Sequence, residues 1–242
     1  MLGHGFGNTH VEYRNPISDL NPTIWLAFNK NNVANAAAPE RVINGGIGGN
    51  DFDALAGAGN PLFLHGAINL GAIDFDGTDD TMRLGSAFQS SNKSFTFAMV
   101  FQKDDTGNDV AICEKEDLSS GFWMRIAGSN ARVDMRMGAS FNQDRAFALT
   151  QAFAADKPQL LIVSRRTGGE VFIYNHEGQI ATNSANEHVL AMPYIKWQSV
   201  SGTANDLDGK VGEIIQFDGD ISAAGIATIQ KEMALKWSIP AY

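Results

Sequence analysis

The 242-residue sequence contains a single cysteine, Cys113, which excludes an internal disulfide and a cysteine-based zinc cluster. No apolar run approaches the roughly 18 residues that a membrane span requires. The first residues lack the basic and apolar regions of a secretory signal, so we expect the protein to be made and used, or assembled, in a reducing cytoplasm. Positive charge is also scarce: 18 Lys and Arg stand against 27 Asp and Glu, and the net charge of −9 disfavours a nucleic-acid partner.

Motifs for catalysis are missing as well. The five histidines show neither H-x-H nor H-E-x-x-H spacing, so a histidine metal centre is not expected. There is no Gly-x-Ser-x-Gly nucleophile elbow. The glycine-rich residues 45–50 (GGIGGN) are not followed by the Lys-Ser or Lys-Thr of a phosphate-binding loop. We therefore expect a protein that is not an enzyme.

What the sequence does contain is strand patterning, with 44% hydrophobic residues, enough for the core of one domain. The pattern is clearest in residues 94–102 (SFTFAMVFQ), where large apolar side chains recur with a period of two. That period places them on one face, which another layer must cover. The members of this face are Phe95, Phe97, Met99 and Phe101. Before it, Asp76-Gly77 predicts a tight turn, and Asp79 and Asp80 are expected to accept hydrogen bonds from backbone N–H groups two residues on.

Other segments predict further strands and one helix. Strands are expected at 24–28, 110–113, 121–128, 131–137, 146–150, 159–165, 170–175, 194–200 and 207–217. Residues 29–72 are rich in turn formers and predict a long loop or several short pieces. Near the end, Ser222 is a good helix N-cap, and Ile221 and Ile226 suit a hydrophobic staple. A single helical stripe follows, made of Ile226, Ile229, Met233 and Trp237.

Residues 1–20 are rich in glycine, asparagine and histidine and show no period of either kind. We interpret them as an N-terminal arm, either flexible or ordered against a neighbouring subunit. Residues 21–242 then form one domain, with no internal repeat.

Three segments carry a family resemblance. FDGTDD at 75–80, SFTFAMVF at 94–101 and LDGKVGEIIQF at 207–217 resemble, in this order, the concanavalin A-like lectin/glucanase superfamily. The similarity is to its laminin-G-like domain, of the kind found in bacteriophage virion proteins. The resemblance implies an all-β fold, an antiparallel jelly-roll β-sandwich with one short C-terminal helix. Glycosidases of this fold carry Glu-x-Asp-x-Glu on a strand, with both carboxylates on one face. The nearest cluster here, EKED at 114–117, places Asp117 on the opposite face from Glu114, which favours a solvated turn.

One candidate binding face lies on the hairpin predicted at 121–137. Its polar side would carry Trp123, Arg125, Arg132, Asp134 and Arg136. An exposed tryptophan among arginines can stack on a sugar ring or anchor a protein interface. The alternative is a set of ordinary surface charges, half covered by residues 29–72.

The resemblance also implies calcium, which laminin-G-like domains often hold at the rim of the sandwich. The candidate oxygen ligands are Asp104, Asp105, Asn108 and Asp109, or Asp206 and Asp208. Calcium requires six to eight oxygens, roughly, from more than one loop. Solvated acidic turns are the alternative.

Two hypotheses about function follow. The opening MLGHGFGN resembles the MLGLGN-like starts of phage virion proteins, which implies a non-catalytic structural subunit of a virion, either a capsid decoration or a tail-associated protein. Its partners would be other virion proteins, in a homo-oligomer or on a lattice. The alternative is a carbohydrate-binding, receptor-binding lectin module, assisted by calcium.

Overall fold

The structure is a computed structural model. It describes residues 15–28, 41–56, 62–64, 68, 70–76, 80, 82–86, 88–89, 94–104, 109–113, 121–127, 129–138, 144–184, 191–192 and 208–240.

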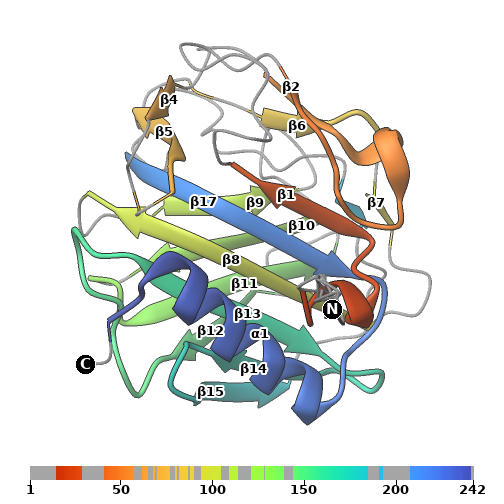
Figure 1. Cartoon of the computed structure of the whole chain (residues 1–242). Coiled ribbons are helices and arrows are strands. Elements are labelled where there is room, and N and C mark those ends of the chain that lie inside the picture. Colours follow the sequence, from red (N-terminus) through yellow and green to blue (C-terminus); the bar gives the residue numbers. More distant parts are fainter. Residues whose placement is uncertain are drawn as a thin grey trace, which may run out of the picture.

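The larger sheet has eight strands, and its neighbours follow the order β15-β14-β13-β8-β17-β5-β4, with β1 also paired to β17 (Figure 1). The described pairings are all antiparallel. The strands are β1 (Ile24–Ala27), β4 (Leu62–Leu64), β5 (Ala72–Asp76), β8 (Phe95–Lys103), β13 (Gln159–Arg165), β14 (Glu170–Tyr174), β15 (Gln179–Ser184) and β17 (Asp208–Phe217).

A second sheet has the order β12-β11-β10-β9, and each strand runs antiparallel to its neighbour. Its strands are β9 (Asp109–Cys113), β10 (Gly121–Ala127), β11 (Arg132–Gly138) and β12 (Asp144–Ala148). Short pairings complete the described β-structure: β16 (Ala191–Met192) with β7 (Phe88–Gln89), and β2 (Arg41–Val42) with β3 (Ala54–Ala56) and β6 (Met82–Leu84). Two 3-10 turns are also described: η1 (Ser18–Leu20) precedes β1, and η2 (Gly49–Phe52) lies between β2 and β3.

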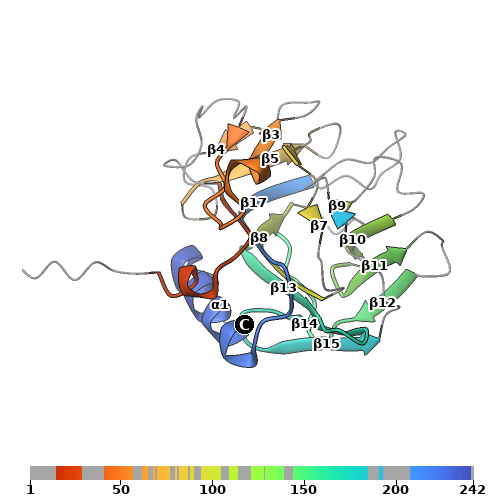
Figure 2. The same ribbon diagram turned by 90° about the vertical axis from the view of Figure 1, so that its right-hand side faces the viewer.

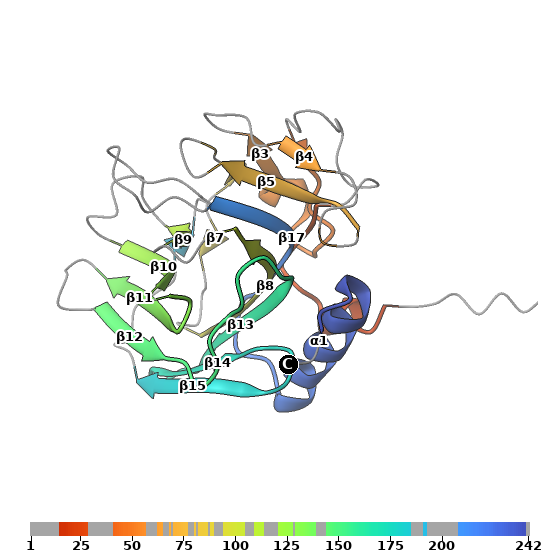
Figure 3. The same ribbon diagram turned by 90° about the vertical axis from the view of Figure 1, so that its left-hand side faces the viewer.

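The two main sheets pack face to face and enclose the larger hydrophobic core, so the domain is a β-sandwich (Figures 2 and 3). The predicted face of β8 lies in this core with all four of its members buried. Opposite it are Met124 and Ile126 of β10 and Val133 and Met135 of β11. The alternation in the sequence therefore identified one wall of the sandwich correctly.

The helix α1 (Ala223–Trp237) covers the other face of the large sheet (Figure 1). Ser222 is its N-cap, and the Ser222 side chain accepts a hydrogen bond from the backbone N–H of Gly225 over 3.2 Å. The predicted apolar stripe is buried in a second core cluster, which includes Ala98 and Val100 of β8. Both faces of β8 are thus buried, because the helix covers the face that the larger core does not.

The predicted fold class is confirmed: an antiparallel jelly-roll β-sandwich with one short C-terminal helix. Residues 29–72 were predicted to form either a long loop or several short pieces, and their described parts contain several short elements. The strand predicted at 194–200 lies outside the described residues. The partners expected for Asp79 and Asp80 stay a prediction, but one contact of Asp80 is described. Its buried carboxylate accepts from the N–H of Asp76, four residues earlier, over 2.9 Å.

The described part of the predicted arm packs on the domain. Ile17 is buried in the second core cluster, and η1 ends at Asn21 in a left-handed conformation. Attachment to the sandwich therefore starts before residue 20. Residues 1–14 lie outside the described part, so an arm on a neighbouring subunit stays a prediction. Among the described residues, no helix is long and apolar enough to span a membrane.

Candidate functional site

The hairpin of β10 and β11 brings the five predicted face residues together. The register pairs Trp123 with Arg136, Arg125 with Asp134, and Ala127 with Arg132. Because residues directly opposite each other point to the same side of a sheet, these side chains share one face. The alternate residues, such as Met124 and Val133, point into the larger core. The predicted set therefore lies on the outer face of the β9–β12 sheet, the face turned away from the large sheet.

Asp134 is the centre of this face and contacts two arginines. Its Oδ2 accepts from Nε of Arg125 over 3.0 Å, and Nη2 of Arg125 lies 2.9 Å from the same oxygen. Arg132 approaches with Nε 2.7 Å from Oδ1 and donates from Nη2 to Oδ2 over 3.0 Å. The Asp134 side chain is only 8% exposed, while those of Arg125 and Arg132 are 29% and 43% exposed. A buried carboxylate thus holds two partly exposed guanidinium groups in place.

The prediction of an exposed Trp123 is wrong, since this residue is only 6% exposed. Two guanidinium groups lie by its indole: the Cζ atoms of Arg125 and Arg136 are each 5.2 Å from the ring centroid. Arg136 is itself buried. The period of two correctly placed Trp123 on the outer face, but the long arginine side chains cover the ring. Trp123 therefore supports the arginines through cation–π contacts and does not present a stacking surface.

The neighbouring strand β12 contributes small side chains to the same face. Ala146 pairs with Asp134 and Ala148 pairs with Arg132, so both alanines lie beside the guanidinium groups. Both alanines are exposed. Two methyl groups next to two fixed cations provide a flat apolar surface bordered by hydrogen-bond donors.

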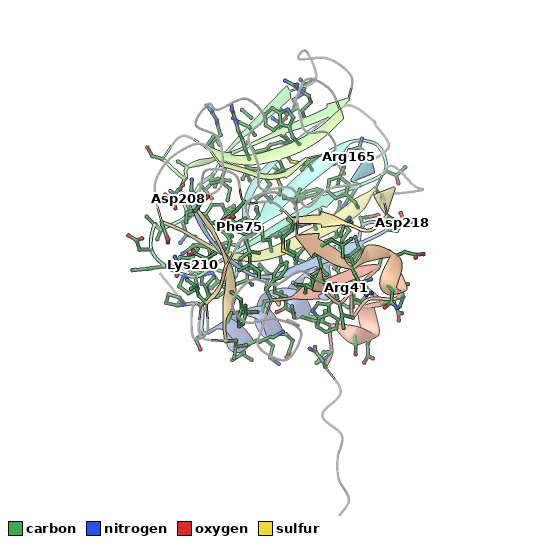
Figure 4. All side chains as sticks on the ribbon, turned by 90° about the horizontal axis from the view of Figure 1, so that it is seen from above. Arg41, Phe75, Arg165, Asp208, Lys210 and Asp218 are labelled. Carbon is green, nitrogen blue, oxygen red and sulfur yellow. The ribbon has the colours of Figure 1, made fainter. Side chains whose placement is uncertain are left out.

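Of the predicted calcium ligands, the structure describes the side chains of Asp104 and Asp208, and these two residues are neighbours. The Asp104 carboxylate contacts the ammonium group of Lys210, and Nζ of Lys210 also lies 3.4 Å from Oδ1 of Asp74. Lys210 and Asp208 both come from β17 and lie on the same side of the molecule (Figure 4). The backbone carbonyl of Asp208 accepts from the N–H of Asp104 over 3.0 Å. Asp74 and Asp104 thus form an ion-pair network centred on Lys210.

The remaining candidate ligands cannot be placed. Asp105, Asn108 and Asp206 lie outside the described residues, and for Asp109 only the backbone, in β9, is described. Among the residues that the structure describes, no group of three His, Cys, Asp or Glu side chains could hold a metal ion. Calcium binding stays a prediction.

Among the buried charged groups that sequence reasoning missed is Glu213. Glu213 of β17 is fully buried under α1, where it accepts from the indole N–H of Trp237 over 2.5 Å and from Lys236 Nζ over 2.7 and 2.8 Å. The indole N–H of Trp25 also donates to it. A glutamate inside the short apolar run of residues 211–215 (VGEII) was the available signal. With its carboxylate surrounded by donors from β1 and α1, Glu213 joins the two ends of the chain and is not open to a ligand.

Comparison with known proteins identifies the fold and nothing finer. No protein-family model and no curated protein sequence matches the chain. Among solved structures, the chain is similar to domain 4 of AbnA, a GH43 extracellular arabinanase of Geobacillus stearothermophilus solved in complex with arabinotriose. The identity is 12% and the TM-score 0.61, over 87% of this chain and 98% of that one.

Two further similar structures belong to larger proteins. The binding domain of botulinum neurotoxin serotype G has 12% identity and a TM-score of 0.64, over 88% of this chain and 51% of that one. The sialidase of Trypanosoma rangeli, in complex with sialic acid, has 11% identity and a TM-score of 0.57, over 88% of this chain and 33% of that one. The chain thus spans about half of the first and a third of the second. The similarity shows the fold alone, that of an antiparallel β-sandwich domain.

Proposed function

We propose that this domain is a non-catalytic glycan-binding module and that its binding surface is the outer face of the β9–β12 sheet. The observation that carries the proposal is the Asp134 clamp, which holds Arg125 and Arg132 partly exposed on a rigid hairpin. Donors that are fixed before binding lose little conformational entropy when a ligand arrives. Sugar hydroxyl and ring oxygens are suitable acceptors for these donors.

Small side chains favour a sugar ring as the ligand. The exposed Ala146 and Ala148 lie beside the arginines. Their short side chains do not project far from the sheet, so a ligand can approach its surface there. The apolar face of a sugar ring can pack on the two methyl groups while its oxygens face the guanidinium groups. The position at the surface of a rigid sheet also suits recognition, since strands position a site more precisely than loops do.

The similar structures support the same proposal by analogy. Domain 4 of AbnA matches this chain over nearly its whole length and was solved with arabinotriose. The likeness is therefore between two whole domains, one of which holds an oligosaccharide. Fold likeness at this identity is an analogy and the site must carry the function.

A glycan array tests the proposal with two matched variants. Arg132→Ala removes one clamped guanidinium, whereas Arg166→Ala removes an arginine of similar exposure that lies over Phe172 of the large sheet. We expect the wild-type domain to bind at least one glycan class, Arg132→Ala to lose roughly 10- to 100-fold in affinity, as expected for a charge-assisted hydrogen bond, and Arg166→Ala to bind normally. Absence of binding to every glycan, with or without calcium, contradicts the proposal.

A second proposal is a structural subunit of a phage virion, with the arm contacting its neighbours. It is supported by the opening residues of the sequence, and the similar structures add nothing to it. Because Ile17 is anchored in the domain, we expect a protein without residues 2–14 to keep the described fold, which its unfolding temperature checks. We expect this truncation to prevent incorporation into purified particles, as measured by mass spectrometry. Normal incorporation of the truncated protein would argue against the role of the arm.

A further inference from the structure

We infer that the ligand of the β9–β12 face is an acidic sugar, recognised through its carboxylate. This inference rests on the proposed function and adds the chemical class of the glycan. Three observations carry it: the charge of the Asp134 clamp, the direction of its remaining donors, and the burial of its aromatic ring.

The clamp carries surplus positive charge on an acidic protein. One carboxylate lies between two guanidinium groups, so Arg125, Arg132 and Asp134 together have a net charge of +1, while the chain carries −9. Asp134 is nearly buried and both its oxygens face arginines. Toward a ligand, the clamp therefore offers donors without a matching acceptor. A neutral sugar, whose hydroxyl groups both donate and accept, uses such a surface poorly.

The geometry of the donors suits a carboxylate. In both arginines the contacts with Asp134 use Nε and Nη2, the side edge of the guanidinium plane. These contacts do not use Nη1, so Nη1 and the second N–H of Nη2, which form the terminal edge, are left for a ligand. Guanidinium edges match carboxylates in a bidentate manner, with two parallel N–H···O hydrogen bonds. Two arginines fixed side by side can each present this edge to one acidic substituent.

The aromatic ring of the face does not serve neutral sugars. Trp123 is only 6% exposed and lies against Arg125 and Arg136. A stacking platform for a neutral sugar requires an open ring face, which Trp123 does not offer. Instead its negative ring face stabilises the cation of Arg125 from within the protein. The contacts of this face thus hold the cations of Arg125 and Arg132 in place and do not expose an aromatic ring.

Calorimetric titration with matched ligands tests this inference. The probes are trigalacturonic acid with its fully methyl-esterified form, and 3′-sialyllactose with its methyl ester, so that each pair differs in the carboxylate charge. We expect at least one acid to bind at least tenfold more tightly than its ester, and this preference to shrink as NaCl is raised. The double variant Arg125→Ala/Arg132→Ala should lose the preference, with the unfolding temperature reporting that it is folded. Arg132→Lys, which keeps the charge but not the fork, should lose most of it.

The outcomes separate the two claims. If the esters, or neutral or sulfated glycans only, bind to the face, the acidic-sugar inference is wrong and the proposed function stands. If the acids bind but the double variant retains their preference, the carboxylate is recognised elsewhere and the inference is wrong. If no glycan binds at all, the proposed function fails with it.

Discussion

The indole nitrogen of Trp237 donates a 2.5 Å hydrogen bond to Oε2 of Glu213, in the buried layer between α1 and β17. Lys236 contacts both oxygens of the same carboxylate, and Trp25 of β1 donates to Oε1. A buried charge is tolerated only where partners replace its lost hydration. This carboxylate therefore connects the first strand, the last strand and the helix, on the side of the domain opposite the proposed binding face.

Trp237→Phe tests the energetic role of this contact. The substitution keeps a buried aromatic ring and removes one donor to a buried charge, so we expect the free energy of unfolding to fall by about 2 kcal/mol. For a chain of this size that corresponds to a melting temperature lower by about 4–8 °C. Leu235→Ala is the control, because Leu235 lies on the same helix but is 68% exposed. Equal melting temperatures for the two variants would contradict the account.

A methyl group at Gly212 should disturb the same layer. A Cβ atom there would lie 2.7 Å from Cζ3 of Trp237, so the indole would have to move away from its place under the helix. We expect Gly212→Ala to destabilise the domain by about 1–3 kcal/mol, the range for overpacked cores. Gly178→Ala is the matched control, since a Cβ atom at that residue would meet nothing within 4 Å. Urea denaturation compares them, and an unchanged midpoint for Gly212→Ala would show that the layer is loosely packed.

The Lys210 network predicts a dependence on alkaline pH. Burial alone lowers the pKa of Lys210, but the hydrogen bond to Asp104 and the charges of Asp74 and Asp104 outweigh it, so its folded-state pKa is raised above the ordinary 10.5. A raised pKa means that this stabilisation is complete below the ordinary value and is lost as the pH rises through the folded value.

Lys210→Met should therefore be less stable than the wild type at pH 7 to 9, by a small amount because the site is partly solvated. The gap should narrow above about pH 10.5, where the wild-type lysine also loses its charge. Chemical denaturation at a series of pH values measures the gap, with the exposed Lys231→Met as the control. A gap that is the same at pH 8 and pH 11 would show that the ion pairs contribute nothing.

Local signals in the sequence were sufficient for much of the fold. The N-cap at Ser222 and the stripe from Ile226 to Trp237 predicted α1 correctly, because capping and the 3.6-residue period depend on neighbours in the chain. The wall of the core on β8 followed from a period of two. That the second face of β8 is buried too could not be predicted, since it depends on where the helix packs.

The site was predicted less completely, for a physical reason. Strand alternation assigns Trp123 and the arginines to one face, and the register confirms this. Strand alternation does not predict which side chains of this face cover others. The burial of Trp123 depends on the conformations of Arg125 and Arg136, which lie against its ring. Asp104 is a similar case. Its partner Lys210 is 106 residues away in the sequence. The sequence around Asp104 therefore could not show whether its carboxylate is solvated in a turn or forms an ion pair.

Asp134→Asn distinguishes preorganisation from charge at the binding face. The substitution raises the net charge of the clamp, so a surface that acted by charge alone would bind an acidic glycan more tightly. If Asp134 acts by fixing Arg125 and Arg132, the two cations become mobile and repel each other. We expect affinity for the acid that the wild type prefers, trigalacturonic acid or 3′-sialyllactose, to fall several-fold, measured by calorimetric titration on folded protein. A rise in affinity would contradict the role of Asp134 as a clamp.

The most direct test of the binding face is hydrogen exchange with and without the acid, trigalacturonic acid or 3′-sialyllactose, that binds more tightly in the calorimetric titration. The account predicts slower exchange of backbone amides in β10, β11 and β12 when the glycan is present, with α1 unchanged. The Arg125→Ala/Arg132→Ala variant should show no slowing. Protection confined to α1 or to residues 41–53, or exchange in β10–β12 that is the same with and without the glycan, would contradict a glycan site on this face.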